Sequence, residues 1–183
     1  ADRAKAITGQ LLATGIEADQ NLITVKDVLR ETLEFLRPAA NDKIILREEI
    51  LTPYVTVSAD PTQLFRVFIN LARNAIQAME ERGGTLTVTL DTRKGAEVRN
   101  PAAGKQTVDE YALIRFADTG PGMDEAIAAR MFEPFFTVGK QSSGTGLGLT
   151  VVSGIISAID GKISVTTKKG RGTVIEILIP SLF

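Results

Sequence analysis

The stretch FINLARNAIQAM, residues 68–79, combines a strongly apolar helical pattern with three side-chain amides. Asn70, Asn74 and Gln77 recur at i, i+4 and i+7, so they line one stripe of the predicted helix. Asparagine is a mediocre helix former, and a buried amide without a partner costs about 1–3 kcal/mol. The pattern raises the question of what these amides hold. The opposite, core face of the helix would be formed by Leu64, Phe68, Leu71, Ala75 and Met79.

The amide stripe suits a hard cation held by neutral oxygen. Magnesium keeps most of its waters and takes only one or two protein ligands beside phosphate oxygens. For Asn70 or Asn74 alone, however, a hydrogen bond to nearby backbone is the more common role. The stripe by itself leaves both interpretations open.

The composition of the 183 residues, 44% hydrophobic and 23% charged with a net charge of -1, indicates a globular chain with one sizeable core. Lys and Arg are scattered, which argues against nucleic acid and against a membrane surface. No apolar run approaches the ~20 residues of a membrane span, and no signal peptide opens the chain, so we expect a cytoplasmic domain. Cysteine and histidine are both absent, which excludes disulfides, thiolate metal sites and an imidazole base.

The pattern along the chain mixes helices and strands without regular βαβ alternation. This predicts an α+β fold, a two-layer sandwich with helices on one face of a mixed sheet. Asp60 and Pro61 form a good start for the helix that carries the amides, and Pro38 ends an earlier helix whose apolar face includes Phe35. Helices are predicted over 25–37, 61–79, 125–131 and 148–159, and extended segments over 43–51, 54–59, 85–90, 111–117, 161–167 and 172–180, with a connection from 92 to 110.

DTGPGM, residues 118–123, follows a predicted strand and sets an acid at the end of the sheet. Gly120 and Gly122 would let other groups approach the backbone closely. An ionised carboxylate only accepts hydrogen bonds, so Asp118 suits a donor such as an exocyclic amine. Taken alone, this stretch is more often a plain turn.

GTGLGL, residues 144–149, opens the last predicted helix. Free N–H groups at a helix start and the helix dipole favour a phosphate there. The stretch matches neither a Walker sequence nor a dinucleotide fingerprint, and alone it is weak. Together with the amides and Asp118, it would provide metal, base and phosphate contacts for one nucleotide.

Four motifs, in this order, resemble those of sensor histidine kinases of the GHKL ATPase superfamily. NLARNAIQAM is similar to the asparagine box, DTGPGM to the first glycine box, FEPFFT to the phenylalanine box and GTGLGL to the second glycine box. The resemblance covers about residues 25–180 and is closest to the nitrogen-regulation and oxygen-sensing type. It implies a Bergerat fold with ATP held between the helices and a mobile lid over about 123–143, anchored by Phe132, Phe135 and Phe136.

Carried over by position, the resemblance implies that Asn74 coordinates Mg²⁺ and that Asn70 supports the phosphate side. Asp118 would accept the adenine amino group, and Thr173 would lie near the adenine. No catalytic residue is implied in this chain, because the acceptor histidine is absent. The implied ATP-binding set is Asn70, Asn74, Gln77, Asp118, Gly120, Gly122, Met123, Lys140, Gly144, Thr145, Gly146, Leu147, Gly148, Leu149 and Thr173.

The chain departs from its close relatives at two of these positions, and a third distinguishes it from the hydrolysing members of the superfamily. Gln77 stands where many relatives have a basic residue, and Lys140 comes four rather than three residues after Phe136. Asn70 stands where hydrolysing members of the superfamily carry a glutamate that activates water. An amide cannot take a proton, which fits phosphoryl transfer rather than hydrolysis.

Residues 1–20 resemble the end of the second helix of a dimerisation hairpin, so the chain is interpreted as truncated, with its ATP-binding domain over 21–183. The acceptor histidine would lie upstream of Ala1. The implied partners are the phosphoacceptor-histidine hairpin of the same or the sister protomer and the receiver domain of a response regulator. The parent would be a homodimer, with this fragment possible as a monomer. No nucleic acid or direct membrane contact is expected, although the parent could be membrane-anchored.

Other functions stay open beside the histidine kinase. A related protein could phosphorylate serine, as anti-sigma-factor kinases do, but the opening helix argues against it. A nucleotide-sensing module without catalysis is disfavoured by the intact motifs. An ATPase machine is disfavoured by Asn70, which replaces the water-activating acid.

Overall fold

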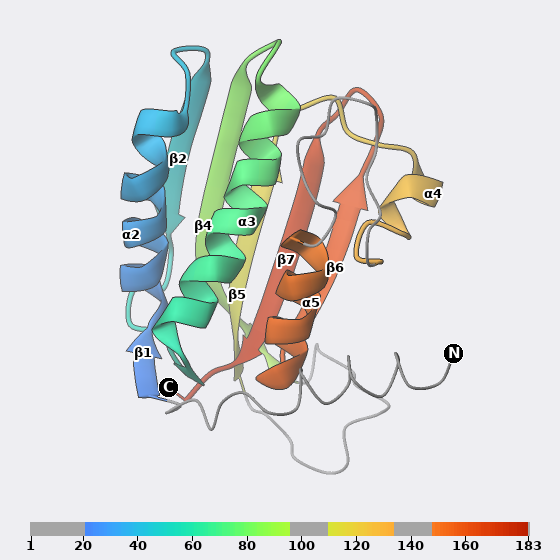
Figure 1. Ribbon diagram of the computed structural model, residues 1–183. Coiled ribbons are helices and arrows are strands. Elements are labelled where there is room, and N and C mark those ends of the chain that lie inside the picture. The colour runs from blue at the N-terminus through green and yellow to red at the C-terminus, as the bar shows by residue number, and fades with distance from the viewer. Residues whose placement is uncertain (1–20, 96–109, 134–147, 183) are drawn as a thin grey trace, which may run out of the picture.

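A five-stranded mixed sheet, in the order β2-β4-β5-β7-β6, forms one layer of the protein. The computed structural model describes residues 21–95, 110–133 and 148–182. Strands β2 and β4 are parallel, and all other neighbours are antiparallel. Helices α2, α3 and α5 lie together on one face of the sheet (Figure 1), so the predicted α+β two-layer sandwich is confirmed. The strands are β2 (Ile44–Ile50), β4 (Gly84–Lys94), β5 (Glu110–Asp118), β6 (Lys162–Thr167) and β7 (Thr173–Pro180).

The longest of the described helices, α3 (Pro61–Met79), begins as predicted at Asp60. The Asp60 Oδ1 accepts hydrogen bonds from the backbone N–H groups of Thr62, at 2.7 Å, and Gln63, at 3.1 Å. These bonds satisfy two of the donors that every helix start leaves free. The remaining helical segments are α2 (Val25–Leu36), the short 3₁₀ helix η1 (Arg37–Ala39), α4 (Glu125–Ala128) and α5 (Gly148–Ala158).

The core lies between the helices and the sheet. All five residues predicted for the core face of α3 are buried. Phe68, with no exposed surface, packs against Phe116 of β5 at a ring-centroid distance of 5.8 Å. Alternate residues of the central strands point into the same core, because successive side chains of a strand face opposite sides. These are Leu86, Val88, Leu90, Ile114, Phe116, Ile175 and Ile177.

Phe35 was predicted on the apolar face of α2, and this prediction is wrong, since 63% of the residue is exposed. It lies one residue before the buried Leu36, about 100° around the helix axis. Thr32 takes the core position instead, with its hydroxyl donating to the Val28 carbonyl oxygen at 2.8 Å. Phe35 packs edge-on against Phe65 of α3, with 5.9 Å between the ring centroids.

A second, two-stranded sheet brings the first and the last of the described segments together. Strand β1 (Asn21–Thr24) pairs antiparallel with β3 (Thr56–Ala59). The Leu182 N–H donates to the Thr56 carbonyl oxygen at 3.0 Å, and Val57 forms a β-bridge with Ser181. The segment after β7 is thereby tied to the small sheet.

Strands β4 and β5 extend beyond their predicted ends. The predicted connection begins at Thr92, but Thr92, Arg93 and Lys94 continue β4 and pair in register with β5 down to Glu110. These polar residues are compatible with a strand because β4 has one face away from the helices. The remainder of the connection, residues 96–109, lies outside the described residues.

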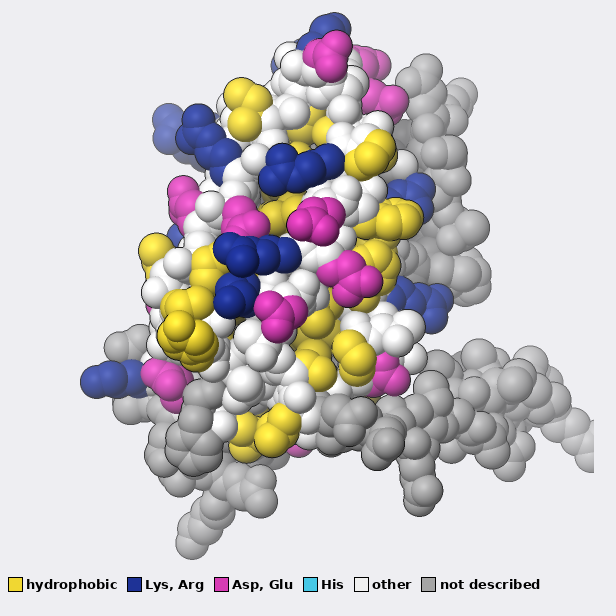
Figure 2. Space-filling view, turned by 90° about the vertical axis from the view of Figure 1, so that its left-hand side faces the viewer, with side chains coloured by type: hydrophobic (Ala, Val, Ile, Leu, Met, Phe, Trp, Pro, Cys, Tyr) yellow, Lys and Arg dark blue, Asp and Glu magenta, His cyan; other side chains and the backbone are white. Residues whose placement is uncertain are grey.

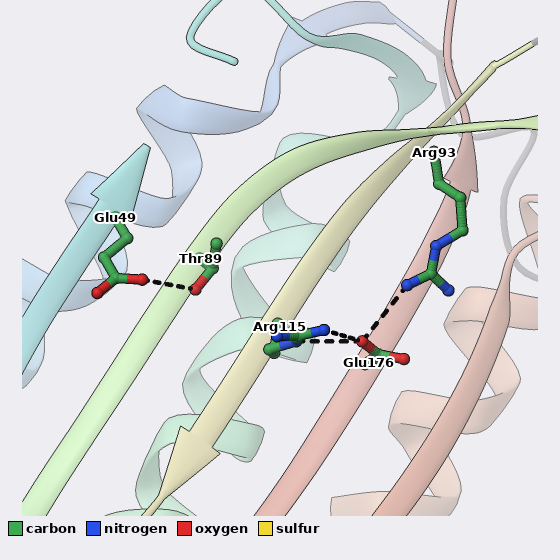
Figure 3. Close-up of polar contacts among 5 residues, drawn as sticks. All are labelled: Glu49, Thr89, Arg93, Arg115 and Glu176. Carbon is green, nitrogen blue, oxygen red and sulfur yellow. Dashed lines mark hydrogen bonds and ion pairs between the residues drawn. The ribbon is translucent and has the colours of Figure 1, made fainter. Parts of the chain in front are cut away.

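Polar side chains from several strands meet on the sheet face away from the helices (Figure 3). Glu176 of β7 accepts from Arg115 of β5, with Nη2 at 2.6 Å, and its Oε1 lies 3.6 Å from Arg93 Nη2 of β4. Further along the same face, the Thr89 hydroxyl donates to Glu49 Oε2 at 3.4 Å. These cross-strand contacts support the register of the four strands β2, β4, β5 and β7.

The surface at the α2 edge of the molecule carries charges of both signs (Figure 2). Lys and Arg side chains alternate there with Asp and Glu, so this face presents no field of one sign. Within the described ranges, no helix has both the length and the apolar character needed to cross a membrane.

Candidate functional site

Three segments that are distant in the sequence meet at one end of the sheet. Strand β5 ends there, α3 ends there, and the hairpin between β6 and β7 turns there, at the upper end of Figure 1. The predicted base-binding residues Asp118 and Thr173 are register partners on the adjacent strands β5 and β7. The fold therefore brings together groups that the sequence separates by 55 residues.

Asp118 is held in place by backbone donors on both sides. Its Oδ1 accepts from the Gly120 N–H at 2.8 Å and from the Thr173 N–H at 3.2 Å. Among the described residues, Oδ2 accepts no hydrogen bond and is available to a ligand. Burial raises the pKa of Asp118, and the two backbone hydrogen bonds only partly oppose this. A half-buried carboxylate with a free acceptor oxygen suits a neutral donor such as an amine.

Gly120 lies against the last turn of α3. A Cβ atom at this position would be 2.8 Å from Asp118 Oδ1 and 3.5 Å from the Ala78 Cβ. The absence of a side chain thus lets residues 119–124, here called the Asp118 loop, approach the end of the amide stripe. Met79 lies beneath, with its Cγ 3.4 Å from the same point, and forms the floor of this junction.

Gly122 and Gly172 allow the loop and the hairpin to touch through their backbones. Both have positive φ, 62° and 86°, where other residues are strained. A Cβ at Gly122 would clash with the Lys168 carbonyl oxygen, and one at Gly172 with the Asp118 carbonyl oxygen. The Gly170 N–H also donates to the Pro121 carbonyl oxygen at 2.6 Å. The loop after β5 and the β6–β7 hairpin therefore form one continuous wall of the candidate site beside Asp118.

Asn70 lies beside the start of α5, and the nitrogen and the oxygen of its side-chain amide have different neighbours. Its Nδ2 donates to the Arg66 carbonyl oxygen at 2.7 Å, which is the backbone role weighed above for an isolated asparagine. Its Oδ1 faces α5, because a Cβ at Gly148 would lie 3.0 Å from this oxygen. The structure therefore joins the amide stripe to the last part of the predicted phosphate cradle.

Asn74 and Gln77 lie between these two junctions on α3, and both are exposed. Asn70 marks one end of the stripe, at α5, and Ala78 marks the other, at the Asp118 loop. These two residues are eight positions apart, which is about 12 Å along the helix axis. The amide oxygens of the stripe are thus open to a ligand that runs along α3 from one junction to the other.

The beginning of the expected lid is tied to both neighbouring elements. The Met123 N–H donates to the Thr167 hydroxyl oxygen at 3.0 Å. Further on, the Thr150 hydroxyl of α5 donates to the Phe132 carbonyl oxygen at 3.4 Å, and Phe132 packs against the core. The helix predicted here for 125–131 is shorter, since α4 ends at Ala128 and turns follow.

Several predicted residues lie outside the described residues. They are Lys140, Gly144, Thr145, Gly146 and Leu147, the lid phenylalanines Phe135 and Phe136, and the opening segment 1–20. Of the second glycine stretch, Gly148 and Leu149 are described, and they begin α5.

Two threonines of the site were missed by the sequence reasoning. Thr119 extends the pairing of β4 and β5, because its N–H and its hydroxyl both bond to the backbone of Thr85, at 3.1 and 2.9 Å. Thr167 joins Met123 to the hairpin. For Thr167 the sequence offered only the pair of threonines at 166 and 167, directly before the basic stretch KKGR (residues 168–171), and threonine is common in strands.

The donor set of the site fits a magnesium nucleotide. A carboxylate acceptor stands at one end of the stripe and a helix start at the other, with exposed amide oxygens between them. Amide and phosphate oxygens suit Mg²⁺, and a helix start suits phosphate. In the described segments, no group of three or more Asp or Glu residues offers an alternative metal centre.

Comparison with known proteins gives consistent results. Sporulation kinase E of Bacillus subtilis (strain 168) is 33% identical over 157 residues, covering 85% of this chain and 19% of that protein. Sensor kinase CckA of Brucella abortus (strain 2308) is 32% identical over 184 residues, covering 100% of this chain and 19% of that protein. The crystal structure of full-length ShkA in complex with AMPPNP has a TM-score of 0.74 at 28% identity, covering 93% of this chain and 33% of that chain.

The chain spans about a fifth of the length of these two curated relatives. Residues 59–182 match the family described as "Histidine kinase-, DNA gyrase B-, and HSP90-like ATPase". The matched region contains α3, the Asp118 loop, the start of α5 and the β6–β7 hairpin, which are the parts that form the site. The chain belongs to the histidine kinase-, DNA gyrase B- and HSP90-like ATPase family.

Proposed function

We propose that this chain is the ATP-binding catalytic domain of a sensor histidine kinase. It transfers the γ-phosphoryl group of ATP to a histidine on a helical hairpin that is not part of residues 1–183. The observation that carries the proposal is the amide stripe of α3, which runs from the Asp118 loop to the start of α5. This arrangement offers base, metal and phosphate contacts along one helix, in a chain of this family.

Each wall of the site has a defined role in this proposal. Asp118 accepts a hydrogen bond from the exocyclic amine of adenine with Oδ2, while its Oδ1 stays bonded to Gly120 and Thr173. Asn74 holds Mg²⁺, which neutralises phosphate charge when bound. Asn70 supports the phosphate side next to Gly148.

Asn70 also favours transfer over hydrolysis. Its Nδ2 is committed to the Arg66 carbonyl oxygen, and an amide oxygen is too weak a base to take a proton from water. Positioning and electrostatics then dominate the chemistry, as in phosphoryl transfer generally. The acceptor histidine supplies the nucleophile.

The names of the relatives support a place in two-component signalling. Sporulation kinase E and sensor kinase CckA are named as kinases, and ShkA was solved with AMPPNP, an ATP analogue. We extend this to the partners: the phosphoacceptor hairpin of the same or the sister protomer, and the receiver domain of a response regulator. We also propose a homodimeric parent of the nitrogen-regulation and oxygen-sensing type, acting in the cytoplasm.

The test begins with calorimetric binding of Mg·ATP to this chain. Asp118→Ala should abolish binding, while Asp42→Ala, at an exposed acid outside the predicted site, should leave it unchanged. Asn74→Ala should remove the magnesium dependence, and its exposed neighbour Arg73→Ala should not. Equal affinities in the wild type and in Asp118→Ala would refute the site.

Transfer is tested with labelled Mg·ATP and a phosphoacceptor hairpin supplied in trans. The proposal expects binding without phosphate release by the chain alone, and acid-labile label on the hairpin when it is added. Steady phosphate release by the chain alone would favour an ATPase. An acid-stable label on the partner would favour a serine kinase.

A further inference from the structure

The hydroxyl of Thr167 joins three parts of the wall beside Asp118. Its Oγ1 accepts from the Met123 N–H at 3.0 Å, donates to the Gly172 carbonyl oxygen at 3.0 Å and lies 3.1 Å from Thr173 Oγ1. These partners belong to the loop after β5, to the hairpin turn and to β7. The neighbouring Thr166 pairs with Val174 of β7, but its exposed hydroxyl lies on the opposite side of β6 and forms no hydrogen bond within the described ranges.

The number of protons at this junction fixes the direction of each hydrogen bond. A hydroxyl has one proton and two lone pairs. Thr167 gives its proton to the Gly172 carbonyl oxygen, so its lone pairs accept the Met123 N–H and the Thr173 hydroxyl. Only this arrangement makes all three contacts of the Thr167 hydroxyl hydrogen bonds at the same time. The Thr173 proton then points at Thr167, and the lone pairs of Thr173 remain for other donors.

The junction is coupled directly to the carboxylate. The Thr173 N–H donates to Asp118 Oδ1, and the backbone of Gly172 touches the Asp118 carbonyl oxygen. A movement of the hairpin would therefore displace one of the two groups that orient Asp118. On the other side, the Met123 N–H fixes the loop that continues from Gly120, which is the second of these groups.

We propose that Thr167 is a positioning residue for the base of the nucleotide. It holds the loop after β5 and the β6–β7 hairpin in register on both sides of Asp118, without touching the ligand itself. This inference rests on the proposed function, because it needs a nucleotide base beside Asp118. It assigns a role to a residue that no motif of the sequence singled out.

The test compares three variants with the wild type. Thr167→Val keeps the shape of the side chain and removes the hydroxyl, Thr167→Ser keeps the hydroxyl, and Thr166→Val makes the same change on the exposed side of β6. Calorimetry gives the Kd of each protein for Mg·ATP and for Mg·ADP, and thermal unfolding without nucleotide gives its Tm.

We expect Thr167→Val to bind both nucleotides about tenfold more weakly, since the three hydrogen bonds of the Thr167 hydroxyl, which orient the wall, are lost. The ratio of the two Kd values should not change, because Thr167 acts at the base and not at the phosphates. Thr167→Ser should bind within about threefold of the wild type, and Thr166→Val should be unchanged. A purely structural role would lower the Tm of Thr167→Val without changing either Kd.

Three results would overturn the inference: wild-type affinity in Thr167→Val, equal weakening in Thr167→Ser, or weakening for ATP but not for ADP. A wild-type chain that binds no nucleotide would refute the proposed function itself, which separates the two failures. If Thr167→Val does not fold, amide hydrogen exchange in the wild type and in Thr167→Ser tests the inference instead. The Met123 amide should exchange slowly in the wild type and in Thr167→Ser, and free exchange would show that the bond to Thr167 is absent.

Discussion

Replacing Gly172 by alanine should damage the protein far more than the same change at Gly170, two residues earlier in the same turn. Both glycines have positive φ, 86° and 77°. A Cβ at Gly170 would meet nothing within 4 Å, whereas a Cβ at Gly172 would overlap the Asp118 carbonyl oxygen and lie 3.1 Å from the Thr119 Cα. Comparing the two variants thus separates the cost of a positive φ, which both share, from the cost of steric overlap with Asp118, which only Gly172→Ala has.

The expected magnitudes follow from these two contributions. Gly170→Ala should lower the free energy of unfolding by about 1 kcal/mol, the cost of a side chain in the left-handed region. Gly172→Ala bears the same cost and an overlap with backbone that no side-chain rotation relieves, which adds about 1–3 kcal/mol. We therefore expect a total loss of about 3 kcal/mol at Gly172.

Urea unfolding of both variants measures these losses, and nucleotide binding gives a second readout. Separation of β5 and β7 at Gly172 would lengthen the 3.2 Å bond from the Thr173 N–H to Asp118 Oδ1, so Gly172→Ala should also bind ATP more weakly. Gly170→Ala should bind normally. Equal losses of stability in the two variants would refute the reasoning, since the contact with Asp118 would then contribute nothing.

Three further predictions concern the carboxylate, the core and the cap of α3. Burial raises the pKa of Asp118, so its ionisation costs the folded state free energy. As the pH rises from about 3.9 through the raised pKa, Asp118→Asn should therefore become more stable relative to the wild type, which urea unfolding at several pH values measures. The same variant should lose ATP binding, because an amide N–H₂ donor replaces the acceptor Oδ2. Phe68→Ala, at a residue with no exposed surface, should cost about 3–5 kcal/mol in urea unfolding, against less than about 1 kcal/mol for Phe35→Ala at 63% exposure. Asp60→Ala removes both cap bonds to α3 and should cost about 1 kcal/mol in the same assay, whereas no loss would mean that water replaces them.

The elements of the fold could be predicted from periodicity and end signals. Asp60 and Pro61 mark the start of α3, and the alternation of apolar residues marks β4, β5 and β7. The order of the strands could not be predicted, because pairing depends on packing between distant segments. The ends of β4 and β5 were missed because Thr92 and Arg93 are polar, and polarity on the open face of a sheet resembles a loop.

The candidate site was predictable where side-chain chemistry is encoded in spacing. The amides of α3 and the acid of the Asp118 loop stand out from the sequence, since apolar periodicity does not explain them. Thr167 and Met79 do not stand out, because a threonine in a strand and a methionine at a core position are ordinary. Their importance arises only from the close approach of the hairpin, the loop and the end of α3.

The position of β7 inside the sheet has a consequence for how the domain acquires its activity. This strand follows all other strands in the chain, yet it lies between β5 and β6 and carries Thr173 to Asp118. Contacts of such long sequence separation form slowly, since loop closure must precede them. A nascent chain that has made α3 and β5 already contains the amides and Asp118, but it still lacks Gly148 and Thr173, which complete the site. Nucleotide binding therefore reports the completion of folding, and ATP acts as a ligand that selects fully folded molecules.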